Sequence, residues 1–576
     1  MLETLLIFAA AIALAWPLGH YLAAVLRGAP MRSDPLFAWI ERPIYAILGT
    51  RPQLGMGWRG YAAAFLLSNL VLLLIVWAIF MTQAWLPLNP NDAPNMGWDL
   101  ALHTAVSFLT NTNQQHYSGQ AQLSHLAQMT GIVGLQVVTP VMALGVVAAT
   151  LRGLFGGRQA MEGQAGATAS TGGVDTVDVG NYWADVVRAS LRFVLPLCLV
   201  LSALLTWQGV PATLAAGPVA TPVAASADFT QQKIPLGPVA PMVAIKQLGS
   251  NGGGWYGPNS AVTLENPTPL SNFLETAAIV LIPVSIVFMV GPFTGRRRFG
   301  AMVFATMLTM SVASAGLSLW SEGHSATALD AALMEGKEVR LGVDASALWA
   351  SLTTQVNNGS VNTMLDSTAP LTGMVSMVNM LINAIWGGVG CGLQQFIVYL
   401  LLAVFLAGLM TGRTPELFGR KIEGPEVRLL AVLVLLQPVV ILGFTALTLA
   451  WPGLAGNSNP GFHGISQVFY EYVSAFANNG SGFEGLGDAT PWWNVSCAIV
   501  LALGRYPALV VPLAIAAMLA AKRRAPEGSG SLQIETPTFV LTLIGIVIIL
   551  TLLQFMPVLV LGPVADHLSL NALLAR

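Results

Sequence analysis

Four short clusters of small polar residues recur along the chain, and each follows a semi-apolar stretch of about 11 to 15 residues, too short to cross a bilayer. Because Gly accepts a positive φ without steric penalty, such loops can turn successive backbone carbonyls toward one point. Rings of carbonyls can replace the hydration shell of a potassium ion, and the clusters contain none of the carboxylates typical of divalent-selective rings. We therefore predict a filter for a dehydrated monovalent cation. The clusters span residues 110–114, 250–254, 357–360 and 478–482.

The candidate ion ligands are the central residues of each cluster, and three of the clusters carry Gly at a matching position where the first carries Asn113. One cluster alone would be interpreted as an ordinary external turn. Four clusters at the same place in four similar units indicate one quasi-fourfold axis instead. The candidates are Asn111, Thr112 and Asn113; Ser250, Asn251 and Gly252; Asn357, Asn358 and Gly359; and Asn478, Asn479 and Gly480.

The remainder of the sequence is typical of a polytopic membrane protein. Of its 576 residues 55% are hydrophobic and 9% are charged, whereas soluble domains carry about 25% charged residues. Apolar runs of roughly 20 residues, each long enough for one membrane span, occur about ten times. The three Cys residues lie in apolar runs and are expected to be buried thiols, and the seven His residues show no metal-ligand spacing. The runs lie near 4–26, 61–83, 126–150, 190–207, 273–292, 300–320, 374–411, 428–450, 495–520 and 538–562.

These patterns predict an all-α polytopic membrane protein with four pseudo-repeats around one pore. Each repeat contains a helix, a pore helix, a filter loop and a second helix, and two extra helices lie outside the repeats. The expected segments are a first extra helix with a cytoplasmic loop at 1–60, repeats at 61–150, 186–292, 299–411 and 428–521, and a last extra helix at 537–562.

The basic residues indicate the orientation of the spans. Most of the 25 Lys and Arg residues fall in clusters after every odd-numbered apolar run. Because cytoplasmic loops retain Lys and Arg, both termini and the loops after even-numbered runs are expected outside. Acidic residues outnumber basic ones in those external loops. This excess either concentrates cations in a negative vestibule or simply reflects the lack of basic residues in exported loops.

The seventh apolar run, 374–411, contains a break. Four glycines in six residues cannot hold a regular helix cheaply. Two full spans joined by a turn would place Arg413 outside, against the charge rule. We therefore predict one interrupted helix whose loop lies below the third cluster. The glycines of the break are Gly387, Gly388, Gly390 and Gly392.

Arg505 is the only basic residue in the middle of an apolar run, because Arg192 and Arg428 lie at the ends of theirs. Charges within a membrane are costly and usually functional. Arg505 either lies in a cavity under the filter, where it repels cations from a straight path, or it snorkels or forms a structural salt bridge.

Seven stretches across nearly the whole chain resemble one family, the potassium-binding A subunit of the bacterial Kdp potassium-transporting ATPase. Their order along the chain is also that of the family. This sequence departs from the usual pattern at Gln114, where Trp is common, and at Trp255 and Asn358. The stretches are 105–113 (AVSFLTNTN), 117–119 (YSG), 245–254 (IKQLGSNGGG), 265–272 (ENPTPLSN), 387–393 (GGVGCGL), 408–416 (GLMTGRTPE) and 477–481 (ANNGS).

The resemblance implies a subunit in the bacterial inner membrane that binds potassium as the transported ion and binds no nucleotide. It also implies that a P-type ATPase catalytic subunit (B) and small single-span subunits (C and F) are its partners. By the same resemblance, the glycine break is a gate or side exit, and Arg413 and Glu416 belong to a docking surface for the ATPase subunit. The alternative is a stand-alone potassium channel or ion-coupled symporter of the same fourfold superfamily.

An enzymatic function of the chain itself has no support in its motifs. The sequence contains no H-E-x-x-H, G-x-S-x-G or G-x-x-x-x-G-K-[ST] motif. It also lacks the Asp-Lys-Thr-Gly phosphorylation motif of P-type ATPases. Any ATP hydrolysis must therefore come from another chain.

The predicted orientation can be tested by thiol labelling. Glu3→Cys and Leu574→Cys should both react with a membrane-impermeant thiol reagent in intact spheroplasts, because both termini are expected outside. Labelling only after lysis would contradict this orientation.

Overall fold

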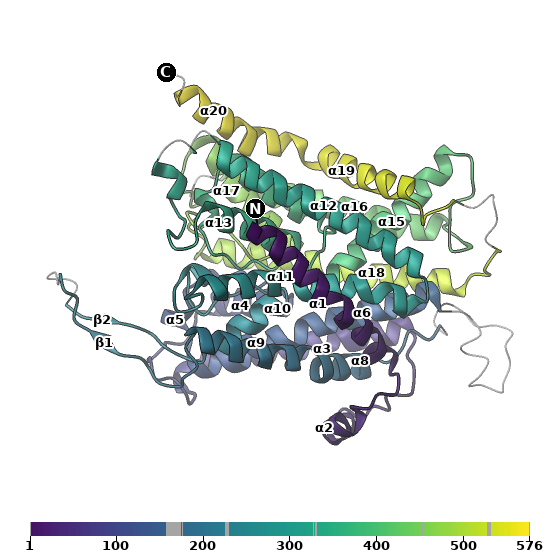
Figure 1. Cartoon of the computed structure of the whole chain (residues 1–576), viewed down its shortest axis with the longest axis horizontal. Helices are drawn as coiled ribbons and strands as arrows, with labels where there is room; N and C mark the ends of the chain where they lie inside the picture. The colour runs from purple at the N-terminus through teal and green to yellow at the C-terminus, as the bar shows by residue number, and fades with distance from the viewer. Residues whose placement is uncertain are drawn as a thin grey trace.

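The computed structural model describes residues 2–156, 174, 177–224, 230–325, 328, 331–451, 453–526 and 532–574. Within these ranges, ten helices are long and apolar enough to cross a membrane. They pack into one bundle (Figure 1). The helices of the spans are α1 (Leu2–Arg27), α3 (Trp58–Thr82), α6 (Gly134–Phe155), α8 (Tyr182–Ala189) continuing into α9 (Leu195–Gln208), α11 (Pro269–Thr294), α12 (Arg297–His324), α15 (Cys391–Met410), α16 (Gly424–Ala450), α18 (Pro491–Ala521) and α19 (Pro537–Leu559).

Shorter elements connect these spans. The short α-helices are α2 (Asp34–Ile47), α4 (Trp98–Leu109), α5 (Gly119–Gln122), α10 (Val239–Leu248), α13 (Val343–Gln355), α14 (Pro370–Ile382), α17 (Gly461–Ala477) and α20 (Ala565–Leu574). The 3-10 turns are Gln83–Trp85, Asn259–Ala261, Ala331–Met334 and Leu365–Ser367, and the π-helical turns are Ala127–Val133, Ser190–Val194 and Val560–Val564. Two antiparallel pairs of two-residue strands are present, β1 (Val219–Ala220) with β2 (Gln232–Lys233) and β3 (Glu416–Leu417) with β4 (Arg420–Lys421).

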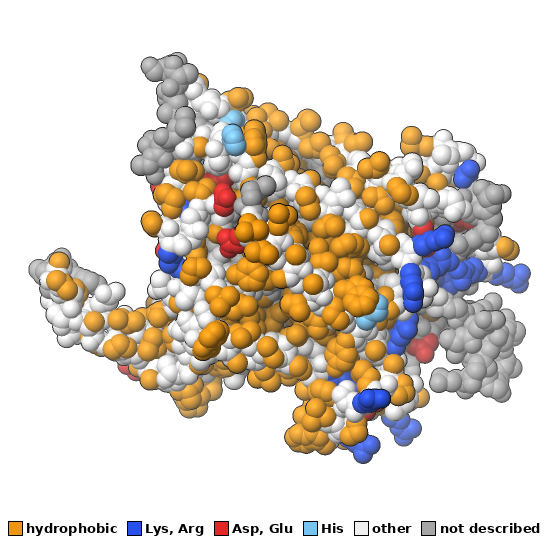
Figure 2. Space-filling view, in the orientation of Figure 1, with side chains coloured by type: hydrophobic (Ala, Val, Ile, Leu, Met, Phe, Trp, Pro, Cys, Tyr) orange, Lys and Arg blue, Asp and Glu red, His pale blue; other side chains and the backbone are white. Residues whose placement is uncertain are grey.

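Burial separates the spans into central and peripheral ones. In their most apolar windows, α6 is 78% buried and α11 is 72% buried, whereas α1 is 22% buried and α3, α16 and α19 are each 28% buried. Large apolar side chains on the peripheral helices therefore face outward, as expected where lipid replaces water. Figure 2 shows Lys and Arg gathered at one end of the bundle, opposite the β1–β2 hairpin and the C-terminus.

The fourth span begins earlier than its apolar run, which was predicted at 190–207. The helix already starts at Tyr182, because its first turns hold a paired charge instead of apolar residues. Arg152 at the end of α6 donates two hydrogen bonds to Asp185, at 2.6 and 2.8 Å. Tyr61 of α3 donates a third at 2.9 Å. These contacts join α3, α6 and α8 at the basic end of the bundle.

Four short helices precede the four clusters, as predicted for pore helices. They are α4, α10, α13 and α17, with 12, 10, 13 and 17 residues. The fourth exceeds the expected length, and His463 in its first turn contacts two other segments, as described below. The predicted break in the seventh run is also present, since α14 ends at Ile382 and α15 begins at Cys391.

His463 connects the first turn of α17 to two other segments. Its Nε2 lies 2.8 Å from Asp366 Oδ1, and its Nδ1 lies 3.0 Å from Asp566 Oδ2 at the start of α20. Burial lowers the pKa of His463, but the hydrogen bonds with the two carboxylates outweigh it and raise the pKa to about 9. The charged imidazolium therefore bridges the loop after the third cluster, the fourth pore helix and the C-terminal helix.

This bridge predicts a pH-dependent stability. Because the pKa is raised above its ordinary value of 6.5, the stabilisation is fully present below about pH 6.5 and is lost as pH rises through about 9. His463→Gln should therefore lower the apparent melting temperature most at pH 6, with a difference from wild type that shrinks toward pH 10. The matched control is His324→Gln on the exposed end of α12. A difference that is constant across this range would contradict the bridge.

Candidate ion-selectivity filter

Each of the four clusters contains a backbone hydrogen bond of the same kind. In each, an N–H in the cluster donates to the carbonyl five residues earlier, near the C-terminus of the preceding pore helix. This common spacing gives the residue-by-residue register of the four loops. The bonds are Thr112 to Ser107 at 3.0 Å, Asn251 to Lys246 at 3.1 Å, Asn358 to Thr353 at 2.8 Å, and Asn479 to Ser474 at 2.9 Å.

Two positions with positive φ flank that shared donor in every loop. The second of them is occupied by Gly in three loops and by Asn in one, which agrees with the matching positions in the sequence. The residues at the first position were already candidate ligands from the sequence, but their positive φ was not predicted, because no Gly marks it. Asn enters the left-handed region more readily than most residues, so its recurrence in three of the four loops was the available signal. The values are Asn111 60° and Asn113 58°, Ser250 52° and Gly252 85°, Asn357 50° and Gly359 86°, and Asn478 59° and Gly480 98°.

The loops contact one another through their backbones. A Cβ built on Gly252 would lie closer than 3.0 Å to the carbonyl oxygen of Asn358, a separation that real Cβ atoms essentially never show. Gly359 has the same relation to Asn479 in the fourth loop, and Gly480 has it to Thr112 in the first.

Asn113 closes the ring from the first loop to the second. Its Cβ would lie 2.8 Å from a Cβ built on Gly253. The four loops therefore touch in the order of the sequence and return to the first, which makes a closed ring around one axis.

Amide side chains join neighbouring repeats as well. Asn358 Nδ2 donates to the carbonyl of Lys246 at 2.7 Å, and Asn479 Nδ2 donates to that of Thr353 at 3.0 Å. Asn111 Nδ2 donates to Ser250 O at 3.1 Å, and the Asn251 amide is hydrogen-bonded to Asn111. These amides hold the loops at fixed separations.

Two of the remaining three cluster asparagines join the loops to their surroundings. Asn478 Nδ2 donates to Leu501 O of α18 at 3.2 Å. Asn357 donates to the Asn383 side chain, at the end of α14. Both amide atoms of Asn113 are buried and find no hydrogen-bond partner among the described residues. Asn113 thus leaves a polar group at the ring that could contact a cation or its water.

A buried charge network supports the second loop, and sequence reasoning did not assign it a role. Lys246 in α10 is fully buried, and its Nζ donates to Asn259 Oδ1 at 2.9 Å, to Ser260 Oγ at 2.7 Å and to Glu265. The backbone carbonyl of Lys246 is also the acceptor for Asn358. The signal available in the sequence was a lysine inside an otherwise apolar pore helix. A buried ammonium without a partner would be very costly, so Lys246 stays paired with Glu265. This pairing fixes Lys246, and with it the backbone carbonyl that accepts from Asn358.

The glycine break lies against the third loop. Gly387 N–H donates to Gln355 O at 2.8 Å, and a Cβ on Gly388 would lie 3.6 Å from Val356 O. Gly390 packs on Ala143 of α6 so closely that an added Cβ would lie 2.6 Å from its carbonyl carbon.

Two features show how tightly the backbone turns within the break. A Cβ on Gly392 would overlap the carbonyl of Trp386. Asn383 has φ 52° and ends α14 in the left-handed conformation. The break is therefore a densely packed segment between the third loop and α6.

Arg505 lies in α18 and is 3% exposed. Its Nη1 donates to Cys391 Sγ at 2.7 Å, at the end of the glycine break. Within the described ranges it forms no ion pair with a carboxylate. The preceding Gly504 packs under the carbonyl of Phe476, near the end of the fourth pore helix. The guanidinium is thus placed between the break and the fourth repeat.

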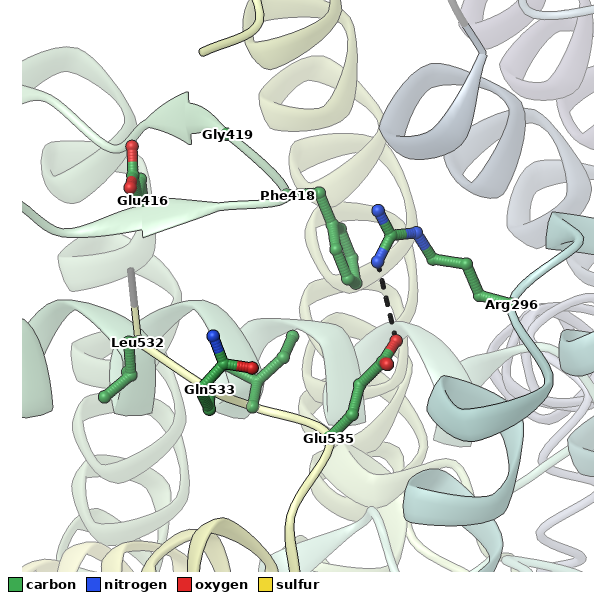
Figure 3. Close-up of a pocket in the computed structure, with 8 residues that line it drawn as sticks. Arg296, Glu416, Phe418, Gly419, Leu532, Gln533 and Glu535 are labelled. Carbon is green, nitrogen blue, oxygen red and sulfur yellow. Dashed lines mark hydrogen bonds and ion pairs between the residues drawn. The ribbon is translucent and has the colours of Figure 1, made fainter. Parts of the chain in front are cut away.

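The predicted docking residues lie on a folded connection between α15 and α16. Arg413 is exposed, and Glu416 is half-buried in β3. Figure 3 shows the Arg296 side chain beside Phe418 at the tip of this hairpin, with Glu416 on the far side of the pocket. Arg296 lies 4.3 Å from the Phe418 ring centroid and 3.5 Å from Glu535.

Arg420 attaches the same hairpin to the bundle. Its Nη2 donates to Gly156 O at 2.7 Å, just beyond the end of α6. Gly419 O accepts a hydrogen bond from Ala525 N at 2.7 Å. The connection is therefore an ordered part of the basic end of the bundle.

Comparison with known proteins gives a consistent match over nearly the full length. Residues 5–568 match the family model described as Potassium-transporting ATPase A subunit. The potassium-transporting ATPase potassium-binding subunit of Gloeobacter violaceus is 44% identical over 565 residues, covering 96% of this chain and 95% of that protein. The subunit of the same description from Pseudomonas entomophila is 43% identical over 576 residues, covering 98% of each.

A search of solved structures finds the crystal structure of the potassium transporter TrkH from Vibrio parahaemolyticus. The TM-score is 0.47 at 15% sequence identity, and the match covers 87% of this chain and 97% of that one.

The second left-handed position is Gly in three loops and Asn in the first, and this difference allows a test of the ring. Gly480→Asn should strain the structure by about 1 to 3 kcal/mol, because its Cβ would overlap Thr112 O. The reciprocal change Asn113→Gly removes a side chain that this loop already accommodates, and it should be nearly neutral. The measurement is the apparent melting temperature of each purified variant. Equal effects of the two changes would contradict the closed ring.

Proposed function

The chain belongs to the potassium-transporting ATPase A subunit family, and on this premise we propose that it binds extracellular potassium in a carbonyl-lined filter for an ATP-driven uptake complex. The observation that carries the proposal is the closed ring of four loops with a common register. Each loop repeats the same pair of positive φ values around one residue. Such a backbone can turn consecutive carbonyls to one side, and four copies form stacked carbonyl rings of the kind that replace a potassium hydration shell.

The proposed ligands are the backbone carbonyls of the twelve cluster residues predicted above. Their side-chain amides mostly bind neighbouring repeats, as Asn358 does with Lys246 and Asn479 does with Thr353. The carbonyls therefore need not depend on flexible side chains for their position. The absence of carboxylates from the clusters favours a monovalent cargo over a divalent one. Potassium is transported in this proposal and is not a resident cofactor.

We further propose that the chain hydrolyses no ATP and binds no nucleotide. The ATP-binding and phosphorylation motifs missing from the sequence support a separate P-type catalytic subunit (B). Small single-span subunits (C and F) complete the proposed complex. Arg413 and Glu416 would contact the catalytic subunit, since both lie on the ordered connection at the basic end of the bundle.

The proposed location is the bacterial inner membrane, with both termini outside. The gathering of Lys and Arg at one end of the bundle supports this orientation (Figure 2). We retain the predicted repeat boundaries as a proposal. The common hydrogen-bond register supports four repeats.

The gate is proposed at Gly387, Gly388, Gly390 and Gly392. Contact of this segment with both the third loop and α6 supports a role in the ion path below the filter. Arg505 would add a fixed positive charge there that opposes straight passage of a cation. Its burial without a carboxylate partner in the described structure supports this role over a structural salt bridge.

Ion-stimulated ATPase activity of the assembled complex tests the filter. Gly252→Ser, Gly359→Ser and Gly480→Ser should each weaken the apparent potassium affinity at least tenfold, equivalent to about 1.4 kcal/mol. They should also admit rubidium or ammonium, because a displaced carbonyl no longer fits bare potassium. Substitutions at the four glycines of the break should change the rate more than the selectivity.

The matched control is Gly443→Ser in α16, where an added Cβ meets nothing within 4 Å. In the same assay the purified chain alone should show no ATPase activity. If all three filter variants keep wild-type affinity and ion ranking, the clusters are ordinary turns and the proposed function is wrong. Potassium-stimulated hydrolysis by the isolated chain would refute the proposal that a separate subunit hydrolyses ATP.

A further inference from the structure

A buried group of metal-binding side chains lies directly beside the first filter loop. His116 follows that loop, Glu471 lies in the fourth pore helix, and Cys497 lies in α18. One ligand atom from each, the His116 nitrogen, a Glu471 oxygen and the Cys497 sulfur, lie within 4.8 Å of one another. All three residues are buried, at 2%, 1% and 0% exposure. We call these three residues the His116 cluster.

The hydrogen bonds of His116 assign its tautomer. Nδ1 lies 2.8 Å from Asn494 Oδ1, while Asn494 Nδ2 donates to Asp99 Oδ2 at 3.0 Å. Because the Asn494 oxygen must accept, Nδ1 carries the proton. A metal-binding histidine typically donates its other ring N–H to such an oxygen, which fixes the ring and raises the basicity of the free nitrogen.

The free nitrogen of His116 points into the cluster. Nε2 is buried, makes no hydrogen bond with the described residues, and lies 3.4 Å from Glu471 Oε1. The lone pairs of a neutral imidazole nitrogen and a carboxylate oxygen repel each other at this distance, and either a proton on Nε2 or a metal ion between the two atoms removes the repulsion. Tetrahedral zinc, with bonds of about 2.0 to 2.1 Å to N and O, would separate these two atoms by roughly 3.3 Å.

We propose that the His116 cluster binds a borderline transition-metal dication such as Zn²⁺ through His116 Nε2, the Glu471 carboxylate and the Cys497 thiolate. Nitrogen, oxygen and sulfur together suit zinc and not the hard ions Mg²⁺ and Ca²⁺. Binding releases the Cys497 proton to solvent, since the thiolate is the ligand. Asp488, whose side chain is 30% exposed and whose Oδ2 lies 3.9 Å from His116 Nε2, provides the opening to the outside and a fourth ligand.

The cluster is connected to the filter through Gln114. Glu471 accepts a hydrogen bond from Gln114 Nε2, and the Gln114 backbone carbonyl accepts one from Ser107 Oγ at 2.8 Å. Gln114 directly follows Asn113, the second left-handed position of the first loop. His103 stacks on His116 at 3.8 Å between ring centroids and lies 3.3 Å from Gln114 Oε1. A metal that takes the Glu471 carboxylate would therefore release Gln114 and weaken potassium binding at the filter.

Metal binding is tested with Co²⁺ as an optical probe on the purified complex. The wild type should show the charge-transfer absorption of a thiolate-bound cobalt ion, and Zn²⁺ should displace it. Cys497→Ser should abolish the band, and Glu471→Gln should weaken Co²⁺ binding at least tenfold. Cys198→Ser in α9 is the matched control and should keep the band. Absence of the band in a monodisperse wild type, or its persistence in Cys497→Ser, would overturn the site.

The link to the filter is tested separately, and it rests on the proposed function. Zn²⁺ should raise the potassium concentration for half-maximal ATPase activity at least tenfold in the wild type and in Cys198→Ser. The ratio of the values with and without Zn²⁺ should return to about one in Cys497→Ser. A cobalt band without any zinc effect would overturn the link while supporting the site. Failure of potassium to stimulate the metal-free complex would instead count against the proposed function.

Discussion

The structure depends on one steric constraint, the direct contact of four backbone loops around a single axis. Gly252, Gly359 and Gly480 lie so close to a carbonyl of the next loop that no side chain fits between them. The loops can approach this closely only because each adopts two left-handed residues around a shared hydrogen bond. The pore helices bring the loops to this ring, and amide side chains hold them in it. Because protein interiors are close-packed, the ring is sensitive to changes of a single methyl group.

Holding polar loops inside a membrane protein requires that their hydrogen bonds be made internally. The cluster asparagines do so by donating to carbonyls of neighbouring repeats, so each loop is positioned partly by another. Lys246 adds to this support. Its ammonium is neutralised by Glu265, and its backbone carbonyl accepts hydrogen bonds from its own loop and from the Asn358 side chain. Such mutual support explains how backbone oxygens can keep a fixed spacing without carboxylates at the ring.

Beside the third loop, the fold uses irregular backbone again. The break between α14 and α15 packs against the third loop and α6, and Arg505 reaches the end of this break through Cys391. The His116 cluster contacts the first filter loop through Gln114. The His463 bridge joins the fourth pore helix to the loop after the third cluster.

The sequence by itself determined the membrane class, the spans, the four clusters and the break at Gly387, because hydropathy and glycine content act locally along the chain. It also showed that Asn113 takes the position in the first cluster that Gly252, Gly359 and Gly480 take in the other three, since the spacing repeats. Only the tertiary structure decided the order of contacts around the ring, the left-handed conformation of Ser250, the neutralisation of Lys246 and the meeting of His116 with Glu471 and Cys497. These features join residues far apart in the chain, and their partners are specified by packing, which no local pattern of residue types records.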